Sequence, residues 1–105
     1  MLLIAMGISQ PAAAGFETGN SLLELCQDQN RMLALACMGY IAGVTDVLFA
    51  NNFKDRRACP QKFNEITITQ ARDFTVQWLQ RNPQLRQYSS APLIAQALEE
   101  SIPCR

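Results

Sequence analysis

Four cysteines are the residues of this chain with the most evident chemistry: Cys26, Cys37, Cys59 and Cys104. An even cysteine count in a short chain with an export-like N-terminus is typical of a disulfide framework, because thiols stay paired only in oxidising compartments. Two antiparallel helices joined by a short turn would bring Cys26 beside Cys37, which leaves Cys59 to pair with Cys104. The alternative, Cys26 with Cys104 and Cys37 with Cys59, stays open at this point, since sequence alone does not choose between connectivities.

Metal and catalytic roles fit these cysteines less well. Structural zinc sites use closely spaced cysteine pairs and histidine partners, whereas the gaps here are wide and the chain has no histidine. A cysteine or serine nucleophile also needs a base, which histidine most often supplies. Asp46 and Asp73 lie in helical stretches without forming an evident acidic pair, so we interpret them as solvated or salt-bridged. We therefore expect no enzyme, no cofactor and no metal.

An apolar segment precedes the cysteines. Residues 1–8 are almost wholly apolar, and residues 9–14 end in the small side chains that a signal peptidase requires. We expect a signal peptide over 1–14, cleaved before Gly15, and a soluble periplasmic product. The basic start of a leader is missing, which leaves open a start upstream of residue 1, and a core helix is the alternative interpretation. We expect no later segment to be long and apolar enough to span a bilayer or insert into a membrane.

The remaining residues, 15–105, are enough for one small domain. A core of that size leaves a thin stability margin, which disulfides would widen. Lys and Arg together number 9, as do Asp and Glu, so the formal charge is zero. This balance argues against nucleic acid and against an anionic membrane surface as partners, since both attract clustered positive charge.

The apolar periodicity is helical almost throughout and predicts an all-α, disulfide-stapled bundle of about four helices. A capping box of Ser21 and Glu24 would start the first helix, because each side chain satisfies a backbone N–H of the first turn. Apolar residues at steps of three and four predict a second helix from about Leu33 to Asn51.

The same signals define two further helices. A capping box of Thr67 and Gln70 predicts the start of the third, and the Asn-Pro pair at 82–83 ends it, because the residue before proline avoids helical angles. Proline in the first turn indicates a fourth helix starting at Ser90, with its inner face at Leu93, Ile94, Ala97, Leu98 and Ser101. That helix should end at Pro103.

The expected second helix contains two glycines, Gly39 and Gly43, on one face. Glycine inside a helix costs about 1 kcal/mol relative to alanine, so a pair of them favours close approach of another backbone. We expect tight packing against a neighbouring helix of the same domain, in preference to a contact between molecules.

Several motifs follow one another along the chain: Cys-x-Gly-Tyr-Ile-x-Gly-Val from Cys37, the Trp78-Leu79 pair, Asn82-Pro83 and the closing Pro103-Cys104. Together they resemble the Rap/Tai family of type VI secretion immunity proteins over nearly all of 15–105. The resemblance implies a small helical periplasmic protein, often a dimer, that inhibits a secreted peptidoglycan amidase by occupying its active-site cleft. Its function would then be recognition of a protein partner.

Two loops are candidates for contact with such a partner. The segment 51–57 combines an aromatic anchor with a charged rim, a composition enriched at interface hot spots: Phe53, Lys54, Asp55 and Arg56. The link 84–90 offers Arg86 and Tyr88 between the third and fourth helices. We hypothesise that one of these loops inserts into the effector, the alternative being ordinary solvated connections.

Two other functional classes remain as alternatives. The first is a periplasmic acid-stress chaperone, a holdase of the small disulfide-bonded helical type. Such holdases use charge imbalance at low pH to expose apolar surface, and a chain with modest charge and no histidine gives little sign of that switch. The second is an envelope-assembly subunit with no link to a toxin.

Overall fold

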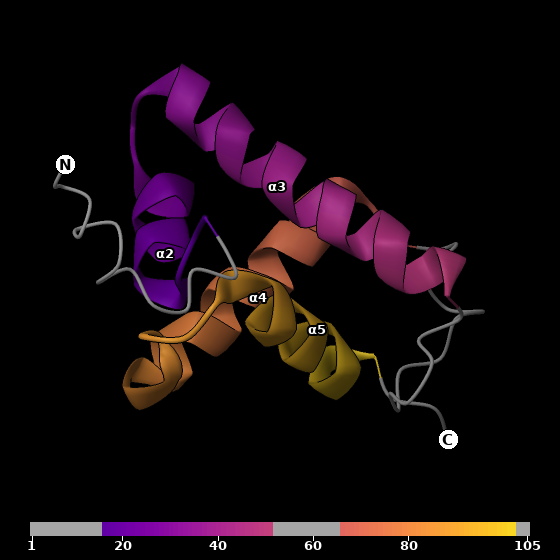
Figure 1. Ribbon diagram of the computed structural model, residues 1–105. Helices are drawn as coiled ribbons and strands as arrows, with labels where there is room; N and C mark the ends of the chain where they lie inside the picture. Colours follow the sequence, from indigo (N-terminus) through magenta and orange to yellow (C-terminus); the bar gives the residue numbers. More distant parts are fainter. Residues whose placement is uncertain (1–15, 52–65, 103–105) are drawn as a thin grey trace, which may run out of the picture.

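The computed structural model describes residues 16–51 and 66–102, which form four α-helices and one 3-10 helix. The α-helices are α2 (Gly19–Gln27), α3 (Arg31–Ala50), α4 (Ile68–Arg81) and α5 (Ser90–Ser101), and η2 (Pro83–Leu85) lies between the last two. Figure 1 shows α3 lying across α4 and α5, with α2 folded back beside the N-terminal half of α3. The prediction of an all-α fold with about four helices is confirmed.

The core lies where the helices meet, and α5 contributes most to it. Four predicted inner-face residues of α5 are buried: Leu93, Ile94, Ala97 and Leu98. From α4, Trp78 and Leu79 pack in the same cluster, and the Trp78 indole nitrogen donates a 2.8 Å hydrogen bond to the Glu100 carboxylate. By contrast, α3 buries only Cys37 and Ile41 although it is 20 residues long.

The first helix starts differently from the expectation. Thr18 is its N-cap and Ser21 is the partner, with Ser21 N donating to Thr18 Oγ1 at 3.2 Å and Thr18 N donating to Ser21 Oγ at 2.9 Å. The predicted box of Ser21 and Glu24 is therefore wrong, and α2 begins at Gly19. The physical reason is tertiary, because the backbone around Gly19 is hydrogen-bonded to the link that precedes α5.

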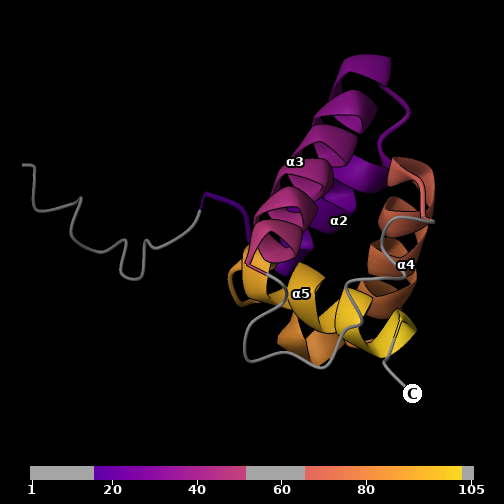
Figure 2. The ribbon, with the colours of Figure 1, turned by 90° about the vertical axis from the view of Figure 1, so that its right-hand side faces the viewer.

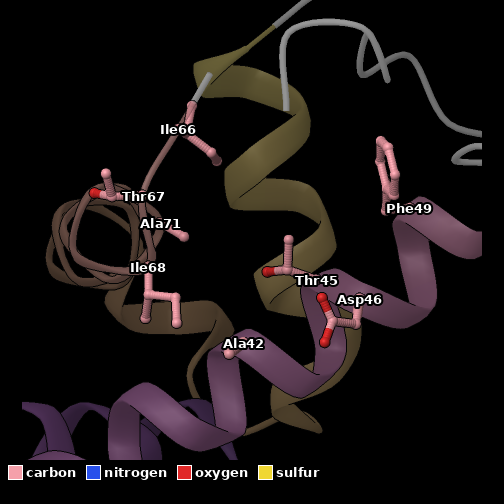
Figure 3. Close-up of a pocket in the computed structure, with 8 residues that line it drawn as sticks. All are labelled: Ala42, Thr45, Asp46, Phe49, Ile66, Thr67, Ile68 and Ala71. Atoms are coloured by element: carbon pink, nitrogen blue, oxygen red, sulfur yellow. The ribbon is translucent and has the colours of Figure 1, made fainter. Parts of the chain in front are cut away.

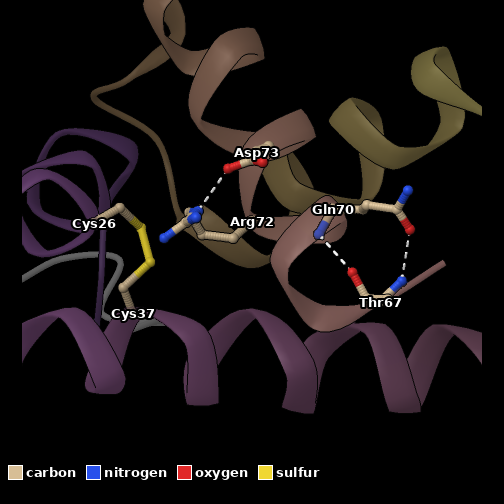
Figure 4. A network of polar contacts seen from close by, with 6 residues as sticks. All are labelled: Cys26, Cys37, Thr67, Gln70, Arg72 and Asp73. Carbon is tan, nitrogen blue, oxygen red and sulfur yellow. Dashed lines mark hydrogen bonds and ion pairs between the residues drawn. A yellow bond between two sulfur atoms is a disulfide. The ribbon is translucent and has the colours of Figure 1, made fainter.

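The other helix boundaries agree with the sequence. The Asn30 side chain caps α3, whose last residue is Ala50 and whose C-cap is Asn51, close to the predicted end. The capping box of α4 is confirmed: Gln70 N donates to Thr67 Oγ1 at 3.1 Å, and Thr67 N donates to Gln70 Oε1 at 2.8 Å (Figure 4). Asn82 is the C-cap of α4, and α5 begins at Ser90. Ile102 is the C-cap of α5, and Pro103 lies outside the described residues.

A disulfide joins the end of α2 to α3. Cys26 and Cys37 have their sulfurs 2.07 Å apart and their Cα atoms 5.0 Å apart (Figure 4). This confirms the hairpin pairing and excludes the alternative connectivity for these two residues. Cys59 and Cys104 lie outside the described residues, as does the expected signal peptide over 1–14, so both remain predictions.

Candidate functional site

Only one of the two predicted contact loops, the link 84–90, lies within the described residues. Phe53, Lys54, Asp55 and Arg56 lie outside the described residues. Arg86 and Tyr88 lie in the link from η2 to α5, which the structure describes completely. The contacts of the candidate partner-binding loop 84–90 are therefore described below.

Backbone hydrogen bonds hold this link against the start of α2. Gly19 N donates to Tyr88 O at 2.9 Å, and Asn20 N donates to Arg86 O at 2.8 Å. In the other direction, Ser90 N donates to Glu17 O at 2.9 Å. The link carbonyls thus satisfy two N–H groups that a helix N-terminus leaves without intrahelical partners, so the loop is fixed to a rigid element.

Arg86 faces inward from this link. Its side chain is half-buried, and Nη1 donates to the Leu79 carbonyl in the last turn of α4 at 3.3 Å. Nε is buried and has no hydrogen-bond partner among the described residues. A positive charge is favourable at a helix C-terminus. Arg86 therefore contributes to the attachment of the link, and less of its guanidinium is available to a partner.

Tyr88 faces outward. It is 55% exposed, while its backbone carbonyl is held by Gly19. The structure thus separates the two predicted residues of the link: Arg86 contacts the scaffold, and Tyr88 presents an aromatic ring to solvent from a fixed backbone.

The two glycines of α3 do not pack as expected. A Cβ added at Gly39 or at Gly43 would meet nothing within 4 Å, and both residues are exposed. The prediction of tight packing against a helix of the same domain is therefore wrong. Glycine spacing identifies a face of low steric bulk, but it does not say whether the backbone that approaches it belongs to the same molecule.

These glycines lie in an exposed and largely apolar face, which we call the outer stripe of α3. Its members recur at helical spacing and are all exposed: Met32, Leu35, Ala36, Gly39, Gly43, Asp46, Val47 and Ala50. Met32 is 75%, Leu35 55% and Val47 62% exposed. Sequence reasoning missed this surface, although Ala36, Gly39 and Gly43 on one face of a helix with few charges were its signal.

The same helix corrects an expectation about membranes. By length and composition, α3 is long and apolar enough to cross a bilayer. It has 20 residues and contains an 18-residue stretch with a mean hydropathy of 1.8, of which 11% is buried inside the structure. The expectation that no segment after the leader is long and apolar enough is wrong. Such a helix is weak support for a membrane span, and here its inner side packs on the other helices and is joined to α2 through Cys37.

Two of the hollows that border α3 lie between it and the helices that follow it in the chain. One of about 390 Å³ lies between α3 and the start of α4, where Phe49, Ala42 and Thr45 face Ile66 and Ile68, with Asp46 at its edge (Figure 3). The other, of about 600 Å³, lies between the outer stripe and α5. Its lining from α5 consists of small or ring side chains: Ala91, Pro92 and Ala95.

Among the residues that the structure describes, no acid and base pair lines either hollow. Within this part of the chain, Asp46 is the only titratable residue lining the first hollow, and Tyr40 is the only one lining the second. Within 16–51 and 66–102, no three His, Cys, Asp or Glu side chains gather as metal ligands would.

Comparison with known proteins gives one family. A search of curated proteins found no match. The family model of the Rap1a immunity proteins matches residues 18–104, which includes every described helix and both predicted contact loops. The resemblance carried by the sequence motifs is thereby confirmed, and the chain belongs to the Rap1a immunity protein family.

Proposed function

We propose that this protein is a periplasmic immunity protein that binds a type VI secretion peptidoglycan amidase and inhibits it by occluding the active-site cleft. The observation that carries the proposal is the family match over 18–104, since an immunity protein acts by binding an effector protein. The Cys26–Cys37 disulfide supports an oxidising compartment, where such a bond persists. The protein itself performs no reaction in this scheme.

Tyr88 is the contact residue that the described geometry favours. Tyrosine is enriched among interface hot spots, where a ring fills a pocket and its hydroxyl keeps a polar partner. Because hydrogen bonds from Gly19 and Asn20 hold the link, binding would order little backbone, and less affinity would be lost to conformational entropy. The segment with Phe53 remains the second candidate and lies outside the described residues.

The decisive experiment combines the purified, oxidised protein with candidate amidase effectors encoded beside it. Peptidoglycan hydrolysis and binding by calorimetry are measured for each pair. One amidase should be inhibited at a one-to-one ratio of chains, and cell fractionation should recover the protein in the periplasm. Suppression of client aggregation at low pH, with no inhibited amidase, would instead favour the holdase alternative.

Substitution of Tyr88 tests which surface blocks the enzyme. Tyr88→Ala should weaken amidase binding about 30-fold, the effect of losing one hot spot of about 2 kcal/mol. The matched control is Ile68→Ala, because Ile68 is also exposed, at 50%, but lies in the first turn of α4. Unchanged affinity of the Tyr88 variant, with inhibition intact, would exclude the link and leave the 51–57 segment.

A further inference from the structure

We propose that Cys26 is the sulfur at which the Cys26–Cys37 disulfide is formed and exchanged, by reaction with a small external thiol or disulfide, and that Arg72 stabilises the negative charge that develops there. The reactants are low-molecular-weight disulfides of cysteine-like size and the thiols into which they are reduced. The inference does not rest on the inhibitory function, because it concerns the bond that joins two helices of the scaffold.

The two sulfurs of the bond differ in access. Cys37 is 0% exposed and belongs to the buried core cluster. Cys26 is only partly buried and packs at the edge of that cluster. Thiol–disulfide exchange requires contact between the attacking sulfur and the sulfur that it attacks, so its rate depends on access. In the folded protein, an external reactant can therefore reach Cys26 and not Cys37.

A small hollow opens beside Cys26. In Figure 2, α2 lies between α3 and α4, and it contacts both. Where the end of α2 meets α4, a hollow of about 240 Å³ is lined by one residue of α2 and four of α4: Cys26, Arg72, Asp73, Val76 and Gln77. Such a volume has room for a cysteine side chain and its nearest atoms, but not for a folded domain. The hollow therefore fits a small thiol or disulfide.

Arg72 brings a positive charge to this hollow. Figure 4 shows its side chain extending toward the disulfide, with Asp73 on the far side of the guanidinium. Arg72 Nε donates to Asp73 Oδ1 at 2.8 Å, which orients the guanidinium and leaves both Nη groups outside this bond. A positive charge beside a cysteine favours its thiolate, which is the reactive form. Because the two side chains are 29% and 50% exposed, solvent screens the charges and keeps the effect modest.

Formation of the bond then proceeds in two balanced steps. The Cys26 thiolate attacks a disulfide R–S–S–R, which forms a bond between Cys26 Sγ and one R–S sulfur and releases the other as R–S⁻. The Cys37 thiol gives its proton to the released thiolate, and its sulfur attacks Cys26 Sγ. This step forms the Cys26–Cys37 bond and releases the second R–S⁻, which takes a proton from water. Two protein thiols are thereby oxidised by two electrons, and one external disulfide is reduced to two thiols.

The fold supplies the second step. The two cysteines have a sequence separation of 11 and lie on helices that form a hairpin, so Cys37 attacks within the same molecule at high effective concentration. Apolar surroundings disfavour the thiolate of a buried cysteine, which makes Cys37 a poor first attacker. Reduction follows the same two steps in reverse, beginning with attack of an external thiolate on Cys26.

The test on the native protein is a trapped exchange. The oxidised, full chain is mixed with a limiting amount of reduced glutathione, quenched with N-ethylmaleimide and digested with trypsin. Trypsin cleaves after Arg31 and so places Cys26 and Cys37 on different peptides. Mass spectrometry should find glutathione on Cys26 and the maleimide on Cys37. Glutathione on Cys37, or equally on both residues, would overturn the proposal.

Single substitutions repeat the comparison without a trapped intermediate. Cys37→Ser leaves Cys26 to react with glutathione disulfide, and Cys26→Ser leaves Cys37. With circular dichroism confirming that both variants are folded, the first should form its adduct at least about tenfold faster, because its sulfur is accessible. Equal rates in the folded variants would contradict the proposal. If either variant unfolds, the peptide assignment on the native protein decides.

Substitution of Arg72 tests the role of its charge. In the Cys37→Ser background, Arg72→Gln should slow the reaction of Cys26 with glutathione disulfide about fivefold, the effect of one nearby charge in water. Arg72→Lys should keep most of the rate, because it keeps the charge. Arg81→Gln is the matched control, since Arg81 is an exposed arginine of the same helix outside the lining of the hollow. A rate indifferent to Arg72→Gln, or lowered equally by the control, would refute the role of Arg72.

Discussion

At the scale of single residues, glycines carry two opposite roles in this protein. Gly19 stands where the start of α2 meets the link before α5. A Cβ there would lie 2.7 Å from Leu93 Cδ1, 2.8 Å from Arg86 Cα and 3.0 Å from Arg86 O. Two of these atoms are backbone and cannot move aside cheaply. Gly39 has no such neighbour within 4 Å. The first glycine permits a contact inside the molecule, and the second leaves a surface open.

Substitution by alanine should separate these roles. Gly19→Ala should lower the free energy of unfolding by about 1 to 3 kcal/mol, because the added methyl overpacks a close backbone contact. Gly39→Ala is the control, and it should stabilise the helix by up to about 1 kcal/mol through helix propensity alone. Urea unfolding followed by circular dichroism measures both. Equal effects of the two substitutions would contradict the structural assignment.

At the scale of helices, side-chain caps decide where the chain changes direction. Thr67 and Gln70 satisfy each other's backbone N–H groups at the start of α4. Ser89 occupies the equivalent position before α5, yet its side chain makes no capping hydrogen bond. The start of α5 is held differently, by the bond from Ser90 N to Glu17 O and by burial of Ser90. The two helices therefore depend on different kinds of interaction.

The two cap positions provide a matched comparison. Thr67→Ala should destabilise the protein by about 1 kcal/mol, because it removes the acceptor of the Gln70 N–H. Ser89→Ala should change stability by less than about 0.5 kcal/mol, since no capping bond is lost. Thermal unfolding of the two variants provides the check. A larger loss at Ser89 than at Thr67 would show that the cap assignment is reversed.

At the scale of the whole molecule, the disulfide holds α2 in register on α3 while α4 and α5 complete the core. Cys37 is fully buried, and the bond closes a loop with a sequence separation of 11. Its entropic effect on the unfolded chain is about 3 kcal/mol. For a domain of this size that is a large part of the total stability.

Removal of this bond tests its contribution. Cys26→Ala combined with Cys37→Ala should lower the free energy of unfolding by about 3 kcal/mol, measured by urea titration with the far-ultraviolet signal. The same variant also reports on the predicted second pair, Cys59 with Cys104. If those residues are bonded, a reductant should destabilise the double variant by about a further 4 kcal/mol, the effect of a longer loop. No response to reductant would refute that pairing.

The sequence predicted well those features that depend on neighbouring residues. The capping box at Thr67 and the stop at Asn82 follow from interactions within one turn of helix, and the inner face of α5 follows from the helical spacing of its apolar residues, so local pattern was sufficient. The hairpin disulfide followed from two helices and a short turn. The candidate site was predicted only in part, since sequence placed Arg86 and Tyr88 in one link without distinguishing their orientations.

What only the tertiary structure decided are the features set by residues distant in the chain. Two capping boxes compete within 18–24, and hydrogen bonds to the link at 86–90 select the one at Thr18. The same bonds turn Arg86 toward α4 and leave Tyr88 exposed. Whether Gly39 and Gly43 contact another helix of the same molecule depends on which side of α3 the other helices pack against. Here α2, α4 and α5 cover one side of α3, and the face that carries the two glycines is left exposed.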